Sequence, residues 1–293
     1  MEARPQPPHF LSLLNDVFDQ EDKDHITKTG YNHNPSSATM VGDDGEVVGA
    51  CMRALYWKAT GEPVTDKKDF TVKMQGMFGG AIHDAITDKL SKSGKIKLTP
   101  ESPGKLLVDP LTHEISFRLD GLVSHLGELG CLEIKTQQSW GLQRMVREGG
   151  PKKSDILQVL CYFGTNEDIR WASLVYVARD TAFRAEYHIY KDPETKEFVI
   201  KGITPTKAEK PLDGLSFERV VSRWKELEGH VDRKELPKRD FKAVLRADGT
   251  VVASKTKNYV EYKTAFQCMY CSWRTLCWTQ PDALENSVKI GGH

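Results

Sequence analysis

The sequence predicts a domain of the α/β or α+β class, in which helices flank a mixed central β-sheet. Helical and extended patterns of apolar residues follow one another along the chain. Apolar residues recur at helical spacing in residues 75–90 and 154–164, and they alternate with polar residues in residues 115–120. A chain of 293 residues is also long enough to bury one sizeable core.

The expected elements follow in the order helix, strands, helix, strands, helix. Helices are expected at residues 51–60, 75–90, 154–164 and 216–228, and strands at residues 115–120, 130–136, 171–177 and 185–190. Ser154 is the expected N-cap of the helix that follows it. Residues 1–49 are polar, with one short helix candidate at residues 10–18, and are expected to form an N-terminal arm. Residues 50–293 are expected to form a single domain.

The composition is that of a soluble protein, with 39% hydrophobic and 28% charged residues. Because 41 basic residues balance 41 acidic ones, any DNA-binding surface must be a local patch. No apolar run is long enough for a membrane helix, and the first ten residues do not resemble a secretory signal. A cytoplasmic, reducing location is therefore expected, where the six cysteines are better metal ligands than disulfide partners.

One segment combines two acidic residues and a lysine in the pattern D-x12-E-x-K. Asp120 is expected to end one strand, and Glu133 and Lys135 share one face of the next, with Ile134 turned to the core. A hairpin would place Asp120 beside Glu133, and two such carboxylates favour a cation between them, Mg²⁺ or Mn²⁺. Lys135 would then orient or help deprotonate the attacking water and stabilise charge on a phosphate. The alternative is an exposed hairpin that carries these residue types by chance.

Two further elements add chemistry to this segment. His83 lies next to the apolar stripe of its helix, and imidazole binds divalent metals, although a solvated or core-edge histidine is the alternative. Gln158 and Tyr162 are four residues apart and share a helical face, opposite much of the apolar set. They could hold the lysine or a phosphate, or form an ordinary surface pair.

Taken in order, these motifs resemble the RecB-like nucleases of the PD-(D/E)XK superfamily. The matching elements are Gly79 to His83, Asp120, Glu133 to Lys135, and Gln158 to Tyr162. The resemblance covers roughly residues 51–190 plus the cysteine-rich tail, and it implies a restriction-endonuclease-like core. One departure is that Leu119, rather than proline, precedes Asp120.

The resemblance also implies roles for these residues. His83, Asp120 and Glu133 would bind the metal, with the backbone carbonyl of Ile134 as a further ligand. Lys135 would be the catalytic lysine. Gln158 and Tyr162 would form an accessory catalytic motif.

Four cysteines form a second candidate site. Cys268, Cys271 and Cys277 have the spacing C-x2-C-x5-C, and Cys51 lies far upstream. This set resembles the iron–sulfur members of the group, which include AddB and the CRISPR-associated RecB-like exonucleases. The resemblance implies a structural 4Fe-4S cluster that staples the C-terminal tail to Cys51, and zinc at the same positions is the alternative.

The remaining two cysteines and the basic residues have other expected roles. Cys131 and Cys161 are expected to be small buried hydrophobic residues. Four basic residues between the Glu133 strand and the Gln158 helix are candidates for DNA binding: Arg144, Arg147, Lys152 and Lys153. A second basic stretch covers residues 233–246, and Trp140 could stack on an unpaired base or belong to the core.

The expected function is a metal-dependent DNA nuclease. By resemblance it is an exonuclease acting on single-stranded or frayed DNA ends in recombination, repair, CRISPR adaptation or phage DNA processing. A non-catalytic DNA-end-binding scaffold and a zinc-stabilised regulator are the alternatives. Because the chain has no G-x-x-x-x-G-K-[ST] motif, unwinding would need a helicase or recombination partner. The oligomeric state stays open.

Overall fold

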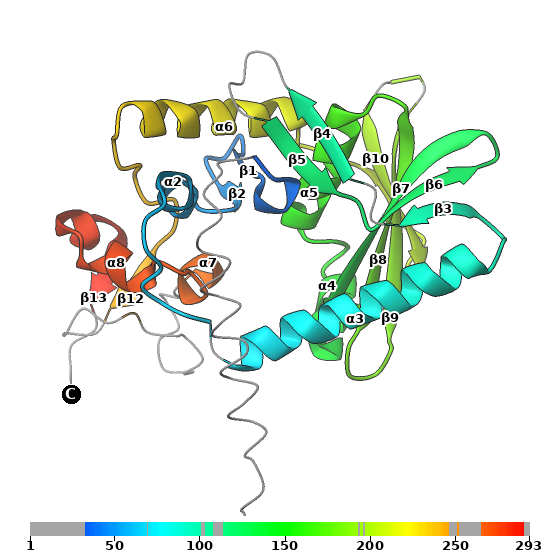
Figure 1. Cartoon of the computed structure of the whole chain (residues 1–293), viewed down its shortest axis with the longest axis horizontal. Coiled ribbons are helices and arrows are strands. Elements are labelled where there is room, and N and C mark those ends of the chain that lie inside the picture. Colours follow the sequence, from blue (N-terminus) through cyan, green and yellow to red (C-terminus); the bar gives the residue numbers. More distant parts are fainter. Residues whose placement is uncertain are drawn as a thin grey trace, which may run out of the picture.

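The computed structural model describes residues 33–68, 70–100, 103–107, 114–192, 194–195, 197–245, 251 and 265–289. Its centre is a seven-stranded mixed sheet with helices on both faces, so the predicted fold class is confirmed (Figure 1). Among the described helices, none has the length and apolar character that crossing a membrane requires. The predicted helix at residues 10–18 lies outside the described residues.

The central sheet has the strand order β11-β10-β9-β8-β7-β6-β3. Its strands are β3 (Lys97–Pro100), β6 (Gly121–His125), β7 (Glu128–Gln137), β8 (Ile169–Ala178), β9 (Arg184–Lys191), β10 (Phe198–Thr204) and β11 (Glu209–Pro211). β7 and β8 pair in parallel, and the other neighbours pair antiparallel. Parallel strands need a long crossover, which two helices supply here.

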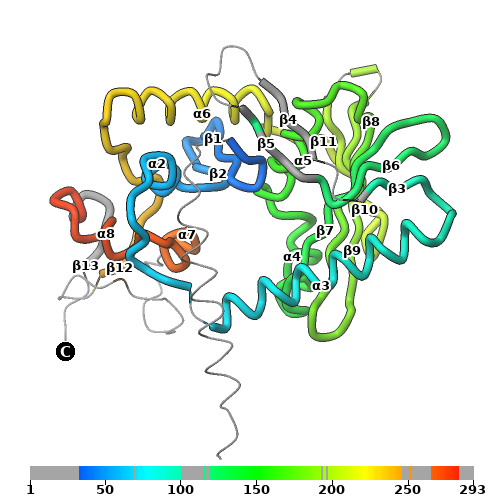
Figure 2. Tube along the Cα trace, viewed as in Figure 1, coloured from blue at the N-terminus to red at the C-terminus, as the bar shows by residue number. Residues whose placement is uncertain are grey.

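The chain trace in Figure 2 shows the helices arranged around this sheet. They are α2 (Met52–Thr60), α3 (Phe70–Lys92), α4 (Ser139–Arg147), α5 (Lys153–Thr165), α6 (Phe217–Asp232), α7 (Phe266–Met269) and α8 (Arg274–Thr279), with the 3₁₀ turns η1 (Pro35–Ser37) and η2 (Pro281–Asn286). Three two-stranded sheets complete the described elements: β1 (Thr39–Val41) with β2 (Val47–Gly49), β4 (Pro103–Leu107) with β5 (Glu114–Arg118), and β12 (Ala243–Leu245) with β13 (Ser287–Lys289).

The two faces of the sheet pack against different helices. On one face, Ile86 and Leu90 of α3 pack against Val123, Leu132 and Ile134. The other face joins the main core, to which α4, α5 and α6 contribute their apolar sides. Because side chains alternate along β7, Ile134 faces α3 while Glu133 and Lys135 face α5. The two residues flanking Ile134 are therefore presented to α5.

Three sequence expectations need correction or extension. Asp120 does not end a strand, because β5 stops two residues earlier and Asp120 directly precedes β6. Ser154 is not an N-cap, because α5 begins one residue before it and Lys152 occupies the capping position without a side-chain bond. The sheet also extends through β10 and β11, which the sequence analysis did not predict.

Residues 33–49, which fall in the expected polar arm, are packed against the domain. Met40 of β1 is fully buried in the main core, and His33 lies 3.1 Å from the carboxylate of Glu228 on α6. The His33 ring also stacks on Trp224. The division of the chain at residue 49 stays a prediction.

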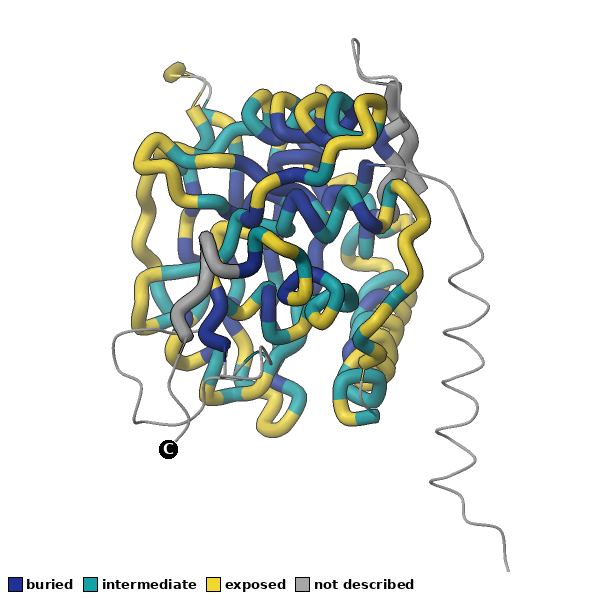
Figure 3. Tube along the Cα trace, turned by 90° about the vertical axis from the view of Figure 1, so that its left-hand side faces the viewer, coloured by how far each residue is buried: buried dark blue, intermediate teal, exposed yellow. Residues whose placement is uncertain are grey.

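The C-terminal tail forms a second apolar cluster with α2. Trp57 of α2 packs there with Trp278 of α8, together with β12 and η2 residues. Arg53 of α2 reaches Asp282 in η2 at 2.7 Å. Figure 3 views this side of the molecule, where buried segments lie among exposed turns. The tail is thus joined to α2 by apolar contacts and by an ion pair.

Candidate active site

The pairing of β6 with β7 brings Asp120 and Glu133 close together. In the antiparallel pair of β6 and β7, Gly121 lies opposite Leu132. Asp120 directly precedes Gly121 and Glu133 directly follows Leu132, so continuing this register places Asp120 opposite Glu133. The backbone nitrogen of Ile134 donates to Oδ2 of Asp120 at 2.7 Å and fixes that carboxylate. The structure therefore has the juxtaposition that the sequence predicted, although Asp120 precedes the strand.

The helix α3 adds His83 to this pair. Its Nδ1 lies 3.3 Å from Oδ1 of Asp120, and both side chains are partly exposed. The helix can approach the end of β7 because Gly79 has no side chain: a Cβ there would meet Oγ1 of Thr136 at 3.0 Å. Asp120 thus lies between a strand amide and an imidazole, directly before the first residue of β6.

Glu133 is the centre of a hydrogen-bond network with α5. Nζ of Lys135 donates to Oε1 of Glu133 at 2.6 Å and to Oε1 of Gln158 at 2.7 Å. Nε2 of Gln158 donates to the same Glu133 oxygen at 3.0 Å and to the Tyr162 hydroxyl at 2.7 Å. That hydroxyl donates to Oε2 of Glu133 at 2.9 Å. Tyr162 is only 1% exposed, so it faces the core rather than lying opposite the apolar residues of α5.

Electrostatics couples these groups. Burial raises the pKa of Glu133; Lys135 acts against this shift, and Asp120 adds to it. For Lys135, burial acts to lower the pKa, but Glu133 and then Asp155 raise it above its ordinary value. Lys135 therefore keeps its proton at neutral pH. The repulsion that Asp120 exerts on Glu133 is what a cation would relieve.

Asp155 is a candidate site residue that the sequence analysis did not include. It lies in the first turn of α5, three residues before Gln158, so both reach the same side of the helix. Oδ2 of Asp155 accepts from the hydroxyl of Tyr176 at 2.7 Å, and Tyr176 pairs with Lys135 across β7 and β8. The spacing to Gln158 is the signal that could have identified it.

The donor types at this site fit Mg²⁺ or Mn²⁺, which prefer oxygen ligands and accept imidazole. They comprise the carboxylates of Asp120 and Glu133, the imidazole of His83 and the nearby Ile134 carbonyl. As the side chains stand, no three His, Cys, Asp or Glu side chains in the part of the chain that the structure describes gather closely enough to hold a metal ion. Both Glu133 oxygens accept hydrogen bonds, so joint ligation requires this carboxylate to turn toward Asp120.

The four predicted cysteine ligands come from α2 and the tail. Cys51 is the N-cap residue of α2, Cys268 and Cys277 lie in α7 and α8, and Cys271 lies between those helices. Burial raises the pKa of Cys268, and the other three thiols raise it further, so the four interact electrostatically. Burial likewise raises the pKa of Cys271 to about 11. All are free thiols.

A buried arginine supports one of these thiols. Nε of Arg239 donates to Sγ of Cys277 at 3.3 Å, and its guanidinium also stacks over the Trp278 ring at 4.7 Å. From the α2 side, Thr65 and Asp66 accept backbone hydrogen bonds from α8, the helix that carries Cys277. Cys131 and Cys161 are fully buried in the main core, as predicted.

The predicted DNA-binding residues lie on α4 and at the start of α5. Arg144 pairs with Glu148 at 3.1 Å, and Lys153 pairs with Glu46 at 3.1 Å. All four, with Arg147 and Lys152 included, are exposed. In the second basic stretch Arg239 is buried beside Cys277 and Arg246 lies outside the described residues, so only part of that stretch is surface.

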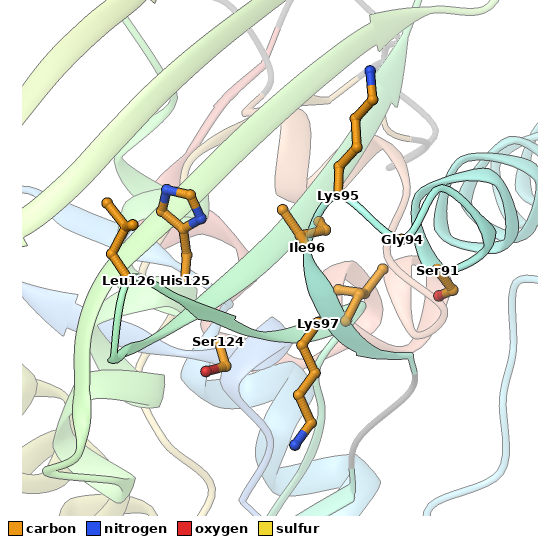
Figure 4. A pocket seen from close by; sticks show the side chains of 9 residues that line it. Ser91, Gly94, Lys95, Ile96, Lys97, Ser124, His125 and Leu126 are labelled. Carbon is orange, nitrogen blue, oxygen red and sulfur yellow. The ribbon is translucent and has the colours of Figure 1, made fainter.

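One pocket of about 520 Å³ lies away from these residues. It is formed where α3 leads into β3 and where β6 turns into β7, with Lys95, Lys97 and His125 in its wall. Figure 4 shows the two lysine side chains extending in opposite directions. Asp120 precedes the other end of β6, so this pocket is separate from the candidate active site.

No protein-family model and no curated protein sequence matches this chain. Among solved structures it is similar to SSO0001, with 13% identity, a TM-score of 0.46, and coverage of 90% of this chain and 96% of that one. It is also similar to an alkaline exonuclease (LHK-Exo) from Laribacter hongkongensis, with 15% identity, a TM-score of 0.38, and coverage of 62% and 80%. The complex of LHK-Exo with dAMP gives 16% identity, a TM-score of 0.39 and the same coverage, 62% and 80%. Such low identities and TM-scores assign no activity to this chain.

Proposed function

We propose that this chain is a metal-dependent DNA nuclease that degrades DNA from single-stranded or frayed ends. The observation that supports it best is the convergence of Asp120, Glu133 and Lys135, with Lys135 held between Glu133 and Gln158. Two carboxylates and an ammonium group beside β7 combine a cation site with a donor for phosphate oxygens. The exonuclease mode comes from the resemblance to RecB-like nucleases.

Each residue has a proposed role in phosphodiester hydrolysis. His83, Asp120, Glu133 and the Ile134 carbonyl would hold Mg²⁺ or Mn²⁺, which supplies an acidified water and neutralises charge on the phosphate. Lys135 uses two of its three ammonium hydrogens on Glu133 and Gln158 within the described residues. The third would donate to a phosphate oxygen. Gln158 and Tyr162 would keep Lys135 and Glu133 oriented.

For the tail we propose a structural 4Fe-4S cluster on Cys51, Cys268, Cys271 and Cys277. Cys268 and Cys277 lie in one buried cluster with Trp57 of α2, and Arg239 donates to the sulfur of Cys277, which supports this proposal. Zinc is the alternative at the same four thiolates. Iron and sulfide analysis with an absorption spectrum distinguishes them, because a 4Fe-4S protein is brown and a zinc protein is colourless.

The nuclease proposal is tested with end-labelled linear single-stranded and duplex DNA beside a covalently closed circle. Cleavage is followed as Mg²⁺ or Mn²⁺ is titrated into wild type and Lys135→Ala. Lys201→Ala is a matched control, since Lys201 forms an exposed strand pair with Glu209 at 3.4 Å, far along the sheet. We expect metal-dependent loss of linear DNA with wild type and Lys201→Ala, and no loss with Lys135→Ala.

Other outcomes identify other functions. Cutting of the closed circle would make the protein an endonuclease. Binding of DNA ends without any cleavage, by well-folded protein at saturating metal, would leave the non-catalytic scaffold. Equal cleavage by wild type and Lys135→Ala would show that another site, or a contaminant, does the chemistry.

A further inference from the structure

The outward face of α4 combines an aromatic ring with two positive charges. Trp140, Arg144 and Arg147 are spaced i, i+4 and i+7, so they share one side of the helix. All three are exposed. The opposite side carries Leu142 and Met145, which are buried in the main core. Because that apolar side is anchored, the orientation of the aromatic and basic face is fixed.

Trp140 is held in place although its ring is open to solvent. The residue is 63% exposed, yet its indole nitrogen donates to Oε1 of Gln138 at 2.6 Å. This short bond limits rotation of the side chain, so little ordering is needed when a ligand stacks on it. A single large exposed ring with its N–H satisfied is suited to a planar partner.

This face begins close to the end of β7, the strand that carries Lys135. α4 starts two residues after the end of β7, and the last three residues of β7 run from Lys135 to Gln137. Arg179 ties the same point to α3, because its backbone nitrogen donates to Gln137 and its guanidinium donates to the Gln75 carbonyl at 3.0 Å. One turn further along α3, Phe78 is 50% exposed. Exposed rings thus project from both elements that border the end of β7.

We propose that the outward face of α4 binds an unpaired DNA strand and guides it to the candidate active site. Trp140 stacks on one base, and Arg144 and Arg147 contact successive phosphates, with the exposed Arg144–Glu148 pair giving way to the phosphate. Stacking platforms beside basic residues are how proteins grip single strands without reading sequence. Duplex DNA fits less well, because its base faces are covered by their neighbours in the stack. This inference rests on the proposed nuclease function.

Binding is measured without cleavage, in the Lys135→Ala background with Ca²⁺, by fluorescence anisotropy of a labelled single-stranded 12-mer. We expect Trp140→Ala to weaken binding about tenfold with an unchanged salt dependence, and Trp140→Phe to retain most of the affinity. Arg144→Ala and Arg147→Ala should each reduce the slope of log affinity against log salt by about 0.7, as expected for one lost phosphate contact on a single strand. An abasic 12-mer should be insensitive to Trp140→Ala.

Two variants of comparable exposed residues serve as controls. Arg170→Ala removes an exposed arginine near the start of β8, and Leu126→Ala removes an exposed apolar side chain at the β6–β7 turn. Both should bind as the background does. Two results would overturn the proposal: unchanged single-strand binding by Trp140→Ala, or equal losses of affinity for single strands and duplex in this variant. Either result would favour a protein partner for this face. Wild-type protein that binds single-stranded DNA through this face but does not cleave it would instead refute the nuclease function and leave the binding proposal supported.

Discussion

Replacing Tyr162 by phenylalanine tests how the accessory residues support the candidate metal ligands. The substitution removes one oxygen atom and keeps the buried ring, which is 1% exposed and packed in the main core. The lost hydroxyl donates to Oε2 of Glu133 at 2.9 Å and accepts from Nε2 of Gln158 at 2.7 Å. One carboxylate oxygen and one amide hydrogen therefore lose their partner.

The expected size of the effect follows from these two contacts. A hydrogen bond to a charged group contributes about 1.5–3 kcal/mol, which corresponds to roughly a tenfold to hundredfold change in an equilibrium constant. Substitution of a residue that orients a metal ligand typically lowers metal affinity or activity by about the same factor. We therefore expect Tyr162→Phe to weaken Mn²⁺ binding about tenfold to hundredfold, with much of the maximal rate recovered at saturating metal.

Calorimetric Mn²⁺ titration and cleavage assays over a range of Mn²⁺ concentrations measure this effect. Tyr190→Phe is the control, since its hydroxyl also donates to a carboxylate, that of Glu209 at 2.7 Å, but on the remote β9–β11 side of the sheet. It should behave as wild type. Mn²⁺ binding by Tyr162→Phe as tight as that of wild type, or no recovery of activity at saturating metal, would refute this role of the Tyr162 hydroxyl.

Three further predictions concern stability and the tail. Asp66→Ala should destabilise the protein by about 1 kcal/mol, because Asp66 accepts from the Thr275 amide at 2.6 Å and so caps α8. Burial acts to raise the Asp66 pKa, but hydrogen bonds from Thr275 and Thr65 and the charge of Arg274 outweigh it and hold that pKa below its ordinary 3.8. This stabilisation is therefore present above pH 3.8 and is lost as pH falls through the lower folded-state pKa. Thermal unfolding of Asp66→Ala and wild type at pH 7 and pH 3 measures it, and an equal loss of stability at both pH values would contradict this role of Asp66. Gly130→Ala should cost about 1–3 kcal/mol in urea unfolding, since the new Cβ would meet the Trp171 ring at 2.3 Å, and a change below 0.5 kcal/mol would show that the ring moves freely. Cys277→Ser should lose the metal that we propose at the four cysteines, as measured by elemental analysis, while Cys161→Ser keeps it, and full metal content in Cys277→Ser would remove that thiol from the proposed ligand set.

Much of the candidate site was predictable because it depends on strand alternation and helical spacing. Glu133 and Lys135 share a face of β7 for the same reason in any strand, and Gln158 and Tyr162 are joined by the i, i+4 spacing of α5. The order of helices and strands followed from the same two periodicities. These features are local and need no knowledge of how distant segments pack.

The parts that were not predicted depend on long-range packing. The sequence could not show that Asp120 would precede β6, because the break in extended chain there comes from strand pairing: β5 pairs with β4 outside the central sheet, and β6 pairs with β7. Tyr162 was expected opposite much of the apolar side of α5, yet it is buried in the main core. Asp66 and Arg239 support the cysteine-bearing segments from distant positions, and no local pattern marks such contacts.

The separation of the apolar side chains into a main core and a tail cluster has a consequence for unfolding. The cluster around Trp57 and Trp278 also contains Cys268 and Cys277, whereas Tyr162 and the inward side of α5 belong to the main core. Groups of residues that bury separate cores can open as separate cooperative units. Removal, by a chelator, of the metal that we propose at the four cysteines should therefore release α2 and the tail to proteases in a first transition. The sheet that carries Glu133 should unfold only in a second one.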